Sequence, residues 1–200
     1  MRLFLNNLEI NNLCRDSRSK KCREYNIIPN KLNSFLNLTL DLSVVREIVL
    51  ERYKHKLDIK SCIILSTAIE YILYELFILL SEKNNSEIYV SDIVQVIEEN
   101  IKFKNLWEKK IKIPDKLFFH INSIVTQVSC LSLDLITEFY LNGLILNFLD
   151  KIFTKTDRIS CKKILYYFKK NTHDIFGLYL LTKILENLQN YKTFIIKHHK

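Results

Sequence analysis

The 200-residue sequence is poor in the residues that make turns: it holds two glycines and two prolines. An all-β sandwich needs many more of both at its turns, so this composition disfavours that class. Hydrophobic residues make up 48% of the chain, more than a solvated, disordered chain carries. The composition therefore predicts a folded, helical protein of one domain or two small ones.

Catalytic, metal-binding and targeting motifs are missing as well. The sequence has no glycine-rich phosphate loop, no HExxH and no Ser/His/Asp or Cys/His arrangement that fits one pocket, so we expect no enzyme activity, cofactor or small-molecule substrate. Its five cysteines are scattered without CxxC spacing, which predicts reduced intracellular thiols and no zinc site. The opening MRLFLNNLEI is too short an apolar run for a secretory signal.

The longest apolar run covers residues 62–80 and contains the stretch AIEYILYEL. About 20 apolar residues can span a bilayer. Glu70 and Glu75 argue against a span, because a carboxylate near the bilayer centre costs about 3 kcal/mol. We therefore expect a helix of a soluble protein and no membrane partner. Apolar residues occupy most of the circumference of this helix, so other elements must cover it on two sides.

Shorter elements are predicted on both sides of this long helix. Asp41 is placed to cap a short amphipathic helix over residues 42–53, and the long helix is expected over 61–83. A β-prone stretch at 88–90 then leads to Ser91, which is placed to cap a second short helix. The order is short, long, short.

The same order recurs in the second half. After a charged linker that contains Pro114, FFHINSIVTQV predicts a short helix and residues 132–153 a long one. Ser160 is placed to cap a short helix, 69 residues after Ser91, which favours a tandem repeat. A further helix, over residues 174–191, is predicted in the second half alone.

These segments resemble core histones. VVREIVLERYKHKL and LSTAIEYILYELFILL resemble histone 2A, whereas SIVTQV, EFYLNGL, RISCKKI and DIFGLYLLTKILENLQNY resemble histone 2B. The sequence is thus similar to the fused histone doublets of large DNA viruses. The resemblance implies an all-α fold of two tandem histone folds that form an intramolecular handshake dimer, with an extra C-terminal helix. The implied domains are a basic N-terminal tail (1–34), a 2A-like fold (35–107), a linker (108–116) and a 2B-like fold with the C-terminal helix (117–200).

The resemblance also implies a function. Histone pairs bind duplex DNA through phosphate contacts without reading its sequence. We expect this chain to compact DNA in nucleosome-like particles with a histone 3/4-like protein or doublet, in the nucleus, a viral factory or a virion. Two alternatives stay open: a histone-fold transcription-factor pair of the CCAAT-binding type, and a helical adaptor that binds only protein.

Candidate site residues follow in part from the resemblance. It matches Arg46, Lys56, Lys155 and Arg158 to DNA-facing positions, and Glu70 and Glu75 to two glutamates of the acidic patch that receives basic peptides. From spacing alone we add Lys60, Lys162 and Lys163 as neighbouring phosphate contacts.

Charge and several departures from the family qualify this expectation. The net charge of +8 favours a polyanionic partner. However, Ile78 stands where the family has a third long-helix glutamate, and the family's later acidic triplet falls on residues 100–102, whose sequence is Asn-Ile-Lys. Glu87 occupies the place of a minor-groove arginine. We therefore expect DNA binding that is weaker or more asymmetric than that of a cellular histone pair.

Overall fold

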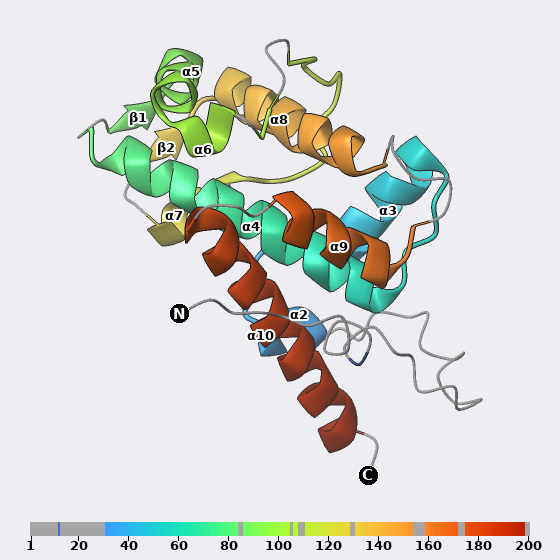
Figure 1. Cartoon of the computed structure of the whole chain (residues 1–200). Helices are drawn as coiled ribbons and strands as arrows, with labels where there is room; N and C mark the ends of the chain where they lie inside the picture. The colour runs from blue at the N-terminus through green and yellow to red at the C-terminus, as the bar shows by residue number, and fades with distance from the viewer. Residues whose placement is uncertain are drawn as a thin grey trace. The chain divides into compact units, whose positions relative to one another are not determined.

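The computed structural model describes residues 12, 31–83, 86–104, 106–107, 111–128, 131–153, 159–171 and 175–198. These residues are mostly helical, which confirms the predicted all-α class (Figure 1). The elements in chain order are α2 (Leu32–Phe35), α3 (Leu42–Tyr53), α4 (Ile59–Ser81), β1 (Glu87–Ile88), α5 (Val90–Glu99), α6 (Ile101–Lys104), α7 (Asn122–Val128), β2 (Ser132–Leu133), α8 (Leu135–Phe153), α9 (Cys161–Asn171) and α10 (Ile175–His198).

The chain divides into two compact units. Unit 1 comprises Met1–Ala68 and Asp157–Lys200, and unit 2 comprises Ile69–Thr156. The division falls inside α4, so this helix begins in unit 1 and ends in unit 2. Each unit therefore combines elements from the first and the second half of the sequence.

In unit 1, helix α3 has the predicted boundaries and the predicted cap. The Asp41 carboxylate accepts hydrogen bonds from the Ser43 N–H at 2.8 Å and from the Ser43 hydroxyl at 2.7 Å. These bonds satisfy a donor that the first helical turn leaves unpaired. The helix ends at Tyr53, and the following residue, Lys54, has a φ of 59°, in the left-handed region, which turns the chain out of the helix.

Helix α4 begins two residues earlier than predicted. The Asp58 carboxylate accepts a hydrogen bond from the Ser61 N–H at 2.6 Å, so Asp58 caps the helix and Ile59 is its first residue. Among the described residues, α4 is the one helix long and apolar enough to cross a membrane, and 67% of its most apolar window is buried inside the protein. This burial is what a core helix requires, because a lipid-facing helix exposes its apolar side chains.

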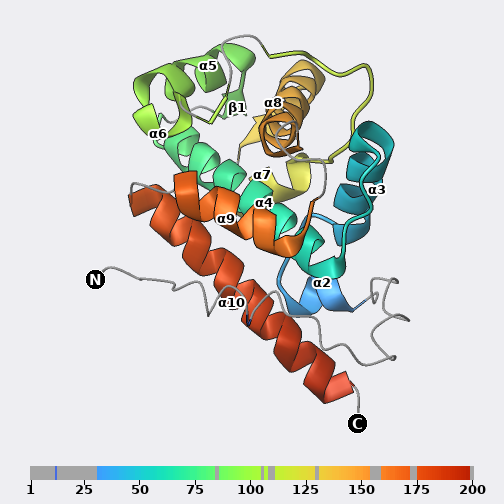
Figure 2. The same ribbon diagram turned by 45° about the vertical axis from the view of Figure 1, so that its right-hand side comes forward.

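The C-terminal helix α10 closes unit 1. It contacts α9 and α2, and the Phe35 and Phe194 rings meet edge to face with centroids 5.2 Å apart. The Asn187 amide donates a hydrogen bond to the Thr67 hydroxyl at 2.9 Å, which ties α10 to α4. Helix α10 extends to His198, past the predicted end at residue 191, since Tyr191 and Phe194 are also buried. Figure 2 shows α10 running beside α9.

We expect Cys62, which is fully buried in unit 1, to resist thiol reagents. Burial raises the pKa of its thiol from 9.0 to about 12, against the opposing effect of Arg46. At pH 9 the folded thiolate fraction is then several hundredfold below that of the unfolded chain, at about tenfold per pKa unit. A variant with serine at the other four cysteines should therefore react with a disulfide reagent several hundredfold more slowly in buffer than in denaturant. Equal rates would contradict the burial of Cys62.

The same shift has a defined sign for stability. A folded pKa above the unfolded value stabilises the protein fully below pH 9 and stabilises it less as the pH rises towards 12. In the Cys62-only variant, the free energy of unfolding should therefore fall between pH 9 and pH 11. Cys62→Ala is the control, because it removes this thiol's contribution to the slope.

In unit 2, a two-residue parallel ladder joins the two halves of the sequence. Glu87 pairs with Ser132 and Ile88 with Leu133. Helix α5 begins just after β1, and its cap differs from the prediction. The Tyr89 N–H donates to the Asp92 carboxylate at 2.9 Å, so the helix begins at Val90 and Ser91 is not its cap.

Helix α8 begins later than predicted because its first predicted residues belong to β2. The Asp134 carboxylate accepts a hydrogen bond from the Thr137 N–H at 2.7 Å and caps the helix. The corresponding prediction for α9 is confirmed, since the Ser160 hydroxyl oxygen accepts a bond from the Lys163 N–H at 3.4 Å.

A segment without regular structure, residues 111–121, is fixed to α8 by two buried polar side chains. The Asn142 carbonyl oxygen accepts from the Phe118 and Phe119 N–H groups at 3.0 and 2.8 Å, and its amide donates to the Phe119 and Glu138 carbonyls, both at 3.0 Å. The Glu138 carboxylate accepts from the Ile121 N–H at 2.9 Å. These bonds explain why α7 begins at Asn122 and leaves the two phenylalanines outside the helix.

Gly143 lets this segment approach α8 closely. A Cβ atom at residue 143 would lie 2.9 Å from both the Ile111 Cγ2 and the Lys112 carbonyl oxygen. Gly143→Ala gains about 1 kcal/mol of helix propensity, but displacing backbone costs about 1–3 kcal/mol. We expect a net loss of about 1 kcal/mol, within a range of about 0–2 kcal/mol, in the free energy of unfolding, measured in urea.

The double variant Ile111→Ala, Gly143→Ala tests the cause. It removes the clash with the side chain but keeps the one with the backbone. The alanine at 143 should therefore cost less in this background, though still more than zero. If Gly143→Ala raised the free energy of unfolding, residues 111–121 would be able to move away from α8 without destabilising the protein.

Candidate DNA-binding surface

The basic residues predicted to contact DNA fall in one unit. Arg46, Lys56, Lys60, Lys162 and Lys163 all belong to unit 1. Lys155 and Arg158 lie outside the described residues, as do residues 1–11 and 13–30 of the N-terminal tail. The described part of the candidate surface is therefore confined to unit 1.

The loop between α3 and α4 carries two of these lysines and leads to a third. Lys54, at the left-handed end of α3, and Lys56 are exposed, and Lys60 lies half-buried in the first turn of α4. Leu57 and Ile59 are buried between them, so they anchor the loop. A buried anchor between exposed lysines holds their backbone in place while the ammonium groups stay in water.

Arg46 lies on α3, half-buried and close to α4. Its positive charge lowers the pKa of the Cys62 thiol, although burial has the larger, opposite effect. The guanidinium is thus near the start of α4, in the same part of unit 1 as Lys60. An arginine held at a protein surface in this way retains its charge at any physiological pH.

The first turn of α9 supplies two further lysines. Lys162 and Lys163 are both exposed, and the Lys162 ammonium lies 5.8 Å from the centre of the Tyr166 ring. The N–H groups of a first helical turn and the helix dipole favour an anion at this end. Lysines in this turn add full positive charges to the partial positive charge at the helix N-terminus.

The starts of α4 and α9 lie side by side within unit 1, as Figures 1 and 2 agree. Two helix N-termini and the lysines of their first turns therefore face one region. This arrangement suits the phosphates of a nucleic-acid backbone, which bind N–H groups at helix starts and the side chains of lysine and arginine.

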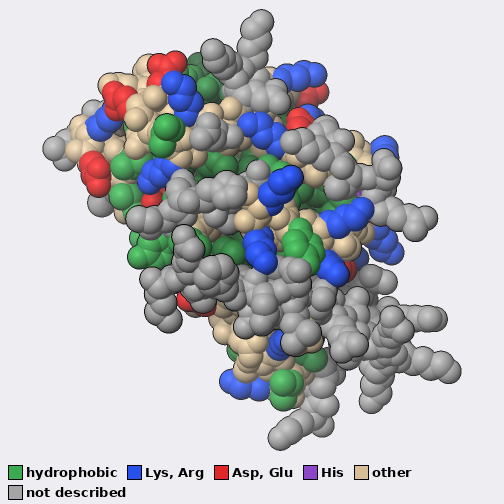
Figure 3. Space-filling model, in the orientation of Figure 1, with side chains coloured by type: hydrophobic (Ala, Val, Ile, Leu, Met, Phe, Trp, Pro, Cys, Tyr) green, Lys and Arg blue, Asp and Glu red, His purple; other side chains and the backbone are tan. Residues whose placement is uncertain are grey.

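Charge is divided unequally between the units. Unit 1 contains 21 lysines and arginines against 10 carboxylates, whereas unit 2 contains nine against 12. On the face shown in Figure 3, basic side chains lie over α9 of unit 1, and acidic side chains gather over β1 and α5 of unit 2. A polyanion is therefore attracted mainly to unit 1.

The candidate acidic patch lies on the part of α4 that belongs to unit 2. Glu70 and Glu75 are both half-buried there. The Glu75 carboxylate pairs with the Lys102 ammonium at 3.4 Å, and the two side chains are 25% and 26% exposed. A basic peptide at this position would have to displace Lys102 from Glu75, and the acidic-patch assignment stays a prediction.

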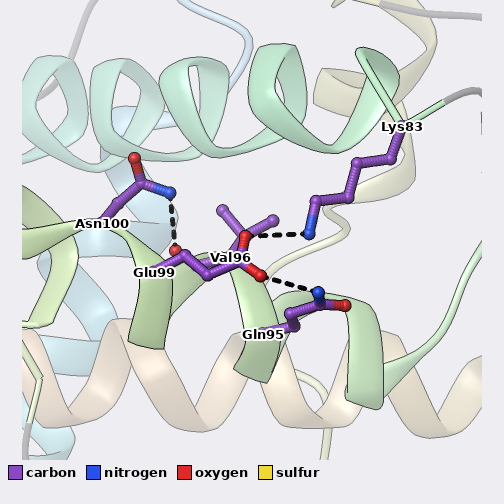
Figure 4. A network of polar contacts seen from close by, with 5 residues as sticks. All are labelled: Lys83, Gln95, Val96, Glu99 and Asn100. Carbon is purple, nitrogen blue, oxygen red and sulfur yellow. Dashed lines mark hydrogen bonds and ion pairs between the residues drawn. The ribbon is translucent and has the colours of Figure 1, made fainter.

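A second ion pair in unit 2 also engages an acidic residue. The Lys83 ammonium lies 3.1 Å from one Glu99 oxygen, and the Gln95 amide donates to the other at 2.7 Å (Figure 4). The hydrogen bond from Gln95 and the contact with Lys83 lower the pKa of Glu99. Asn100 beside it donates to the Val96 carbonyl at 2.8 Å and so completes the end of α5.

Sequence reasoning missed one residue of this surface, Lys54, which is exposed two residues before Lys56. The basic residues gathered between positions 52 and 60 are the signal that would have found it. No group of three or more histidine, cysteine or acidic side chains that could hold a metal ion occurs within the described ranges.

Comparison with known proteins gives no relative to extend this description. No protein-family model matches the chain, and no curated protein or solved structure matches it.

Proposed function

We propose that this chain is a single-chain histone-type doublet that binds duplex DNA without sequence specificity. The observation that carries the proposal is the interleaving of the two sequence halves. Unit 1 combines α3 and the start of α4 with α9 and α10, while unit 2 combines the rest of α4 and α5 with α7 and α8. Two consecutive domains that fold separately would each form a unit of their own.

The β1–β2 pair supports the same arrangement. β1 follows the long helix of the first half, and β2 precedes the long helix of the second. When two long helices cross with opposite direction, the loop after one lies beside the loop before the other. A parallel pairing between those two loops is what a handshake of short-long-short modules requires.

The chemistry of unit 1 supports DNA as the ligand. Its excess of 11 positive charges and its two adjacent helix starts favour phosphates. By the histone resemblance, the chain would compact DNA in nucleosome-like particles with a histone 3/4-like partner, in the nucleus, a viral factory or the virion. Because unit 2 contains few lysines and arginines, the proposed DNA contacts are made mainly by unit 1.

Fluorescence anisotropy with two duplexes of equal length tests this proposal. One duplex contains a CCAAT element and the other does not. We expect affinities equal within about threefold and a steep loss of affinity with salt, because phosphate contacts release counterions. A preference of about a thousandfold for the duplex with the CCAAT element would support a transcription factor. If neither duplex bound, the result would support an adaptor that binds only protein.

Nuclease digestion tests compaction separately. The chain is mixed with a long duplex, with and without a histone 3/4-type tetramer. We expect protected fragments of a defined length when both proteins are present. Digestion indistinguishable from that of the tetramer alone would overturn the nucleosome-like part of the proposal.

A further inference from the structure

The β1–β2 end of unit 2 exposes three large apolar side chains next to one another in the fold. Leu135 and Ile136, in the first turn of α8, are 62% and 67% exposed, and Tyr89, which follows β1, is 49% exposed. Fully burying one such side chain stabilises a protein by about 1.5–3 kcal/mol. Apolar side chains exposed side by side in one patch are a feature of interaction surfaces.

These residues are brought together by the strand pair. Tyr89 directly follows the paired residue Ile88, and Asp134 directly follows its partner Leu133. The Tyr89 hydroxyl donates to the Glu87 carboxylate at 2.5 Å. That bond is the main cause of the raised pKa of Tyr89, and Asp134 and Asp92 add smaller effects, so all three carboxylates lie near this ring.

The surroundings of this apolar group are acidic. Residues 86–101 and 131–150 contain seven carboxylates and no lysine, arginine or histidine. Within unit 2, Glu99 pairs with the Lys83 ammonium, whereas Glu138 accepts the uncharged Ile121 N–H. Glu87, Asp92 and Asp134 likewise accept uncharged hydroxyl or N–H donors. Figure 3 shows acidic and hydrophobic side chains together over β1 and α5.

This chemistry selects the partner. Carboxylates repel phosphates, so the end of the fold where paired loops would hold DNA is unsuited to DNA here. An apolar centre with a charged rim is typical of a protein interface, and the rim selects a partner of opposite charge. Helices that are apolar on one side and basic on the other meet both requirements.

We propose that Tyr89, Leu135 and Ile136, with the rim formed by Glu87, Asp92, Glu98 and Asp134, form a docking surface for a lysine- or arginine-rich amphipathic segment of another protein. We call it the acidic docking surface. This proposal depends on the proposed function in one respect: the proposed function makes DNA the ligand of the chain, and the carboxylates exclude DNA from this end of unit 2. The chain would then hold DNA through unit 1 and a basic protein through unit 2.

Anisotropy with two synthetic helical peptides of equal charge tests this surface. One peptide carries lysine and leucine on opposite faces, and in the other serine replaces each leucine. We expect the lysine/leucine peptide to bind at least about tenfold more tightly. The double variant Leu135→Ser, Ile136→Ser should remove that advantage, and Glu87→Gln, Glu98→Gln should weaken both peptides and reduce their salt dependence.

The matched control is Tyr179→Ser, Ile196→Ser on α10. These side chains are 61% and 66% exposed, close to the values at Leu135 and Ile136, but they belong to unit 1. The control should bind both peptides as the natural chain does. Equal losses in the two double variants, or no loss in Leu135→Ser, Ile136→Ser, would overturn the proposal.

Two further measurements decide between occupants. If the natural chain self-associates in sedimentation and Leu135→Ser, Ile136→Ser abolishes this, a second copy occupies the surface and the proposal is wrong. DNA affinity should be unchanged in both unit 2 variants, and a loss there would mean that DNA occupies it. Peptide binding by a natural chain that fails to bind DNA would retain the docking surface and reject the proposed function.

Discussion

Asn142→Ala is expected to lower the free energy of unfolding by about 3–5 kcal/mol, because a buried side chain that makes four hydrogen bonds is lost. Each of the four bonds contributes about 0.5 kcal/mol at the lower end of the usual range, and the buried Phe119 N–H left without a partner costs about 1–3 kcal/mol more. The loss also frees residues 111–121 from α8. Urea unfolding followed by far-UV circular dichroism measures the change.

Two variants separate the hydrogen bonds from the packing. Asn142→Leu keeps a similar volume but makes none of the bonds, so it should be nearly as unstable as the alanine variant. Asn190→Ala, at an exposed position on α10, should change stability by less than about 0.5 kcal/mol. Natural stability in Asn142→Leu would show that the polar contacts contribute nothing.

Local patterns predicted the starts of α3 and α9, whereas α4, which Asp58 caps, begins two residues earlier than predicted. Asp41 and Ser160 cap α3 and α9, which begin where the sequence places them. The prediction that Ser91 caps α5 was wrong, because a competing local bond from the Tyr89 N–H to Asp92 makes Tyr89 the N-cap, two residues earlier. Several carboxylates and hydroxyls near a helix start can serve as caps, and sequence alone does not rank them.

Elements held by distant contacts were beyond sequence patterns. Residues 111–121 have no period to recognise, since their order comes from Asn142 and Glu138 on α8. For the same reason the charge of Glu75 was predicted but its partner was not. Lys102 lies 27 residues further along the chain, and only the fold brings it within 3.4 Å.

The lysines of the candidate DNA surface could be chosen from the resemblance and from spacing, but their common location could not. Lys56 and Lys163 are more than 100 residues apart in sequence, and it is the packing of unit 1 that places the starts of α4 and α9 together. That shared location gives the surface a collective property, which a variant of several lysines can measure.

Replacing Lys56, Lys60, Lys162 and Lys163 with glutamine is expected to abolish most DNA binding at physiological salt. Each phosphate contact contributes about 0.9 to the slope of log affinity against log salt, so losing four contacts should reduce the slope by about 3 to 4. Anisotropy titrations across a range of salt concentrations measure both quantities. Because no base is read, the loss should be equal for unrelated duplexes.

A matched variant separates this surface from net charge alone. Lys104, Lys112, Lys116 and Lys151 belong to unit 2, and their replacement with glutamine lowers the net charge by the same amount, from +8 to +4. If long-range attraction governed binding, both variants would bind equally weakly. If phosphates bind at the starts of α4 and α9, the unit 2 variant should retain nearly the natural slope, and an unchanged slope in the unit 1 variant would exclude these lysines from the interface.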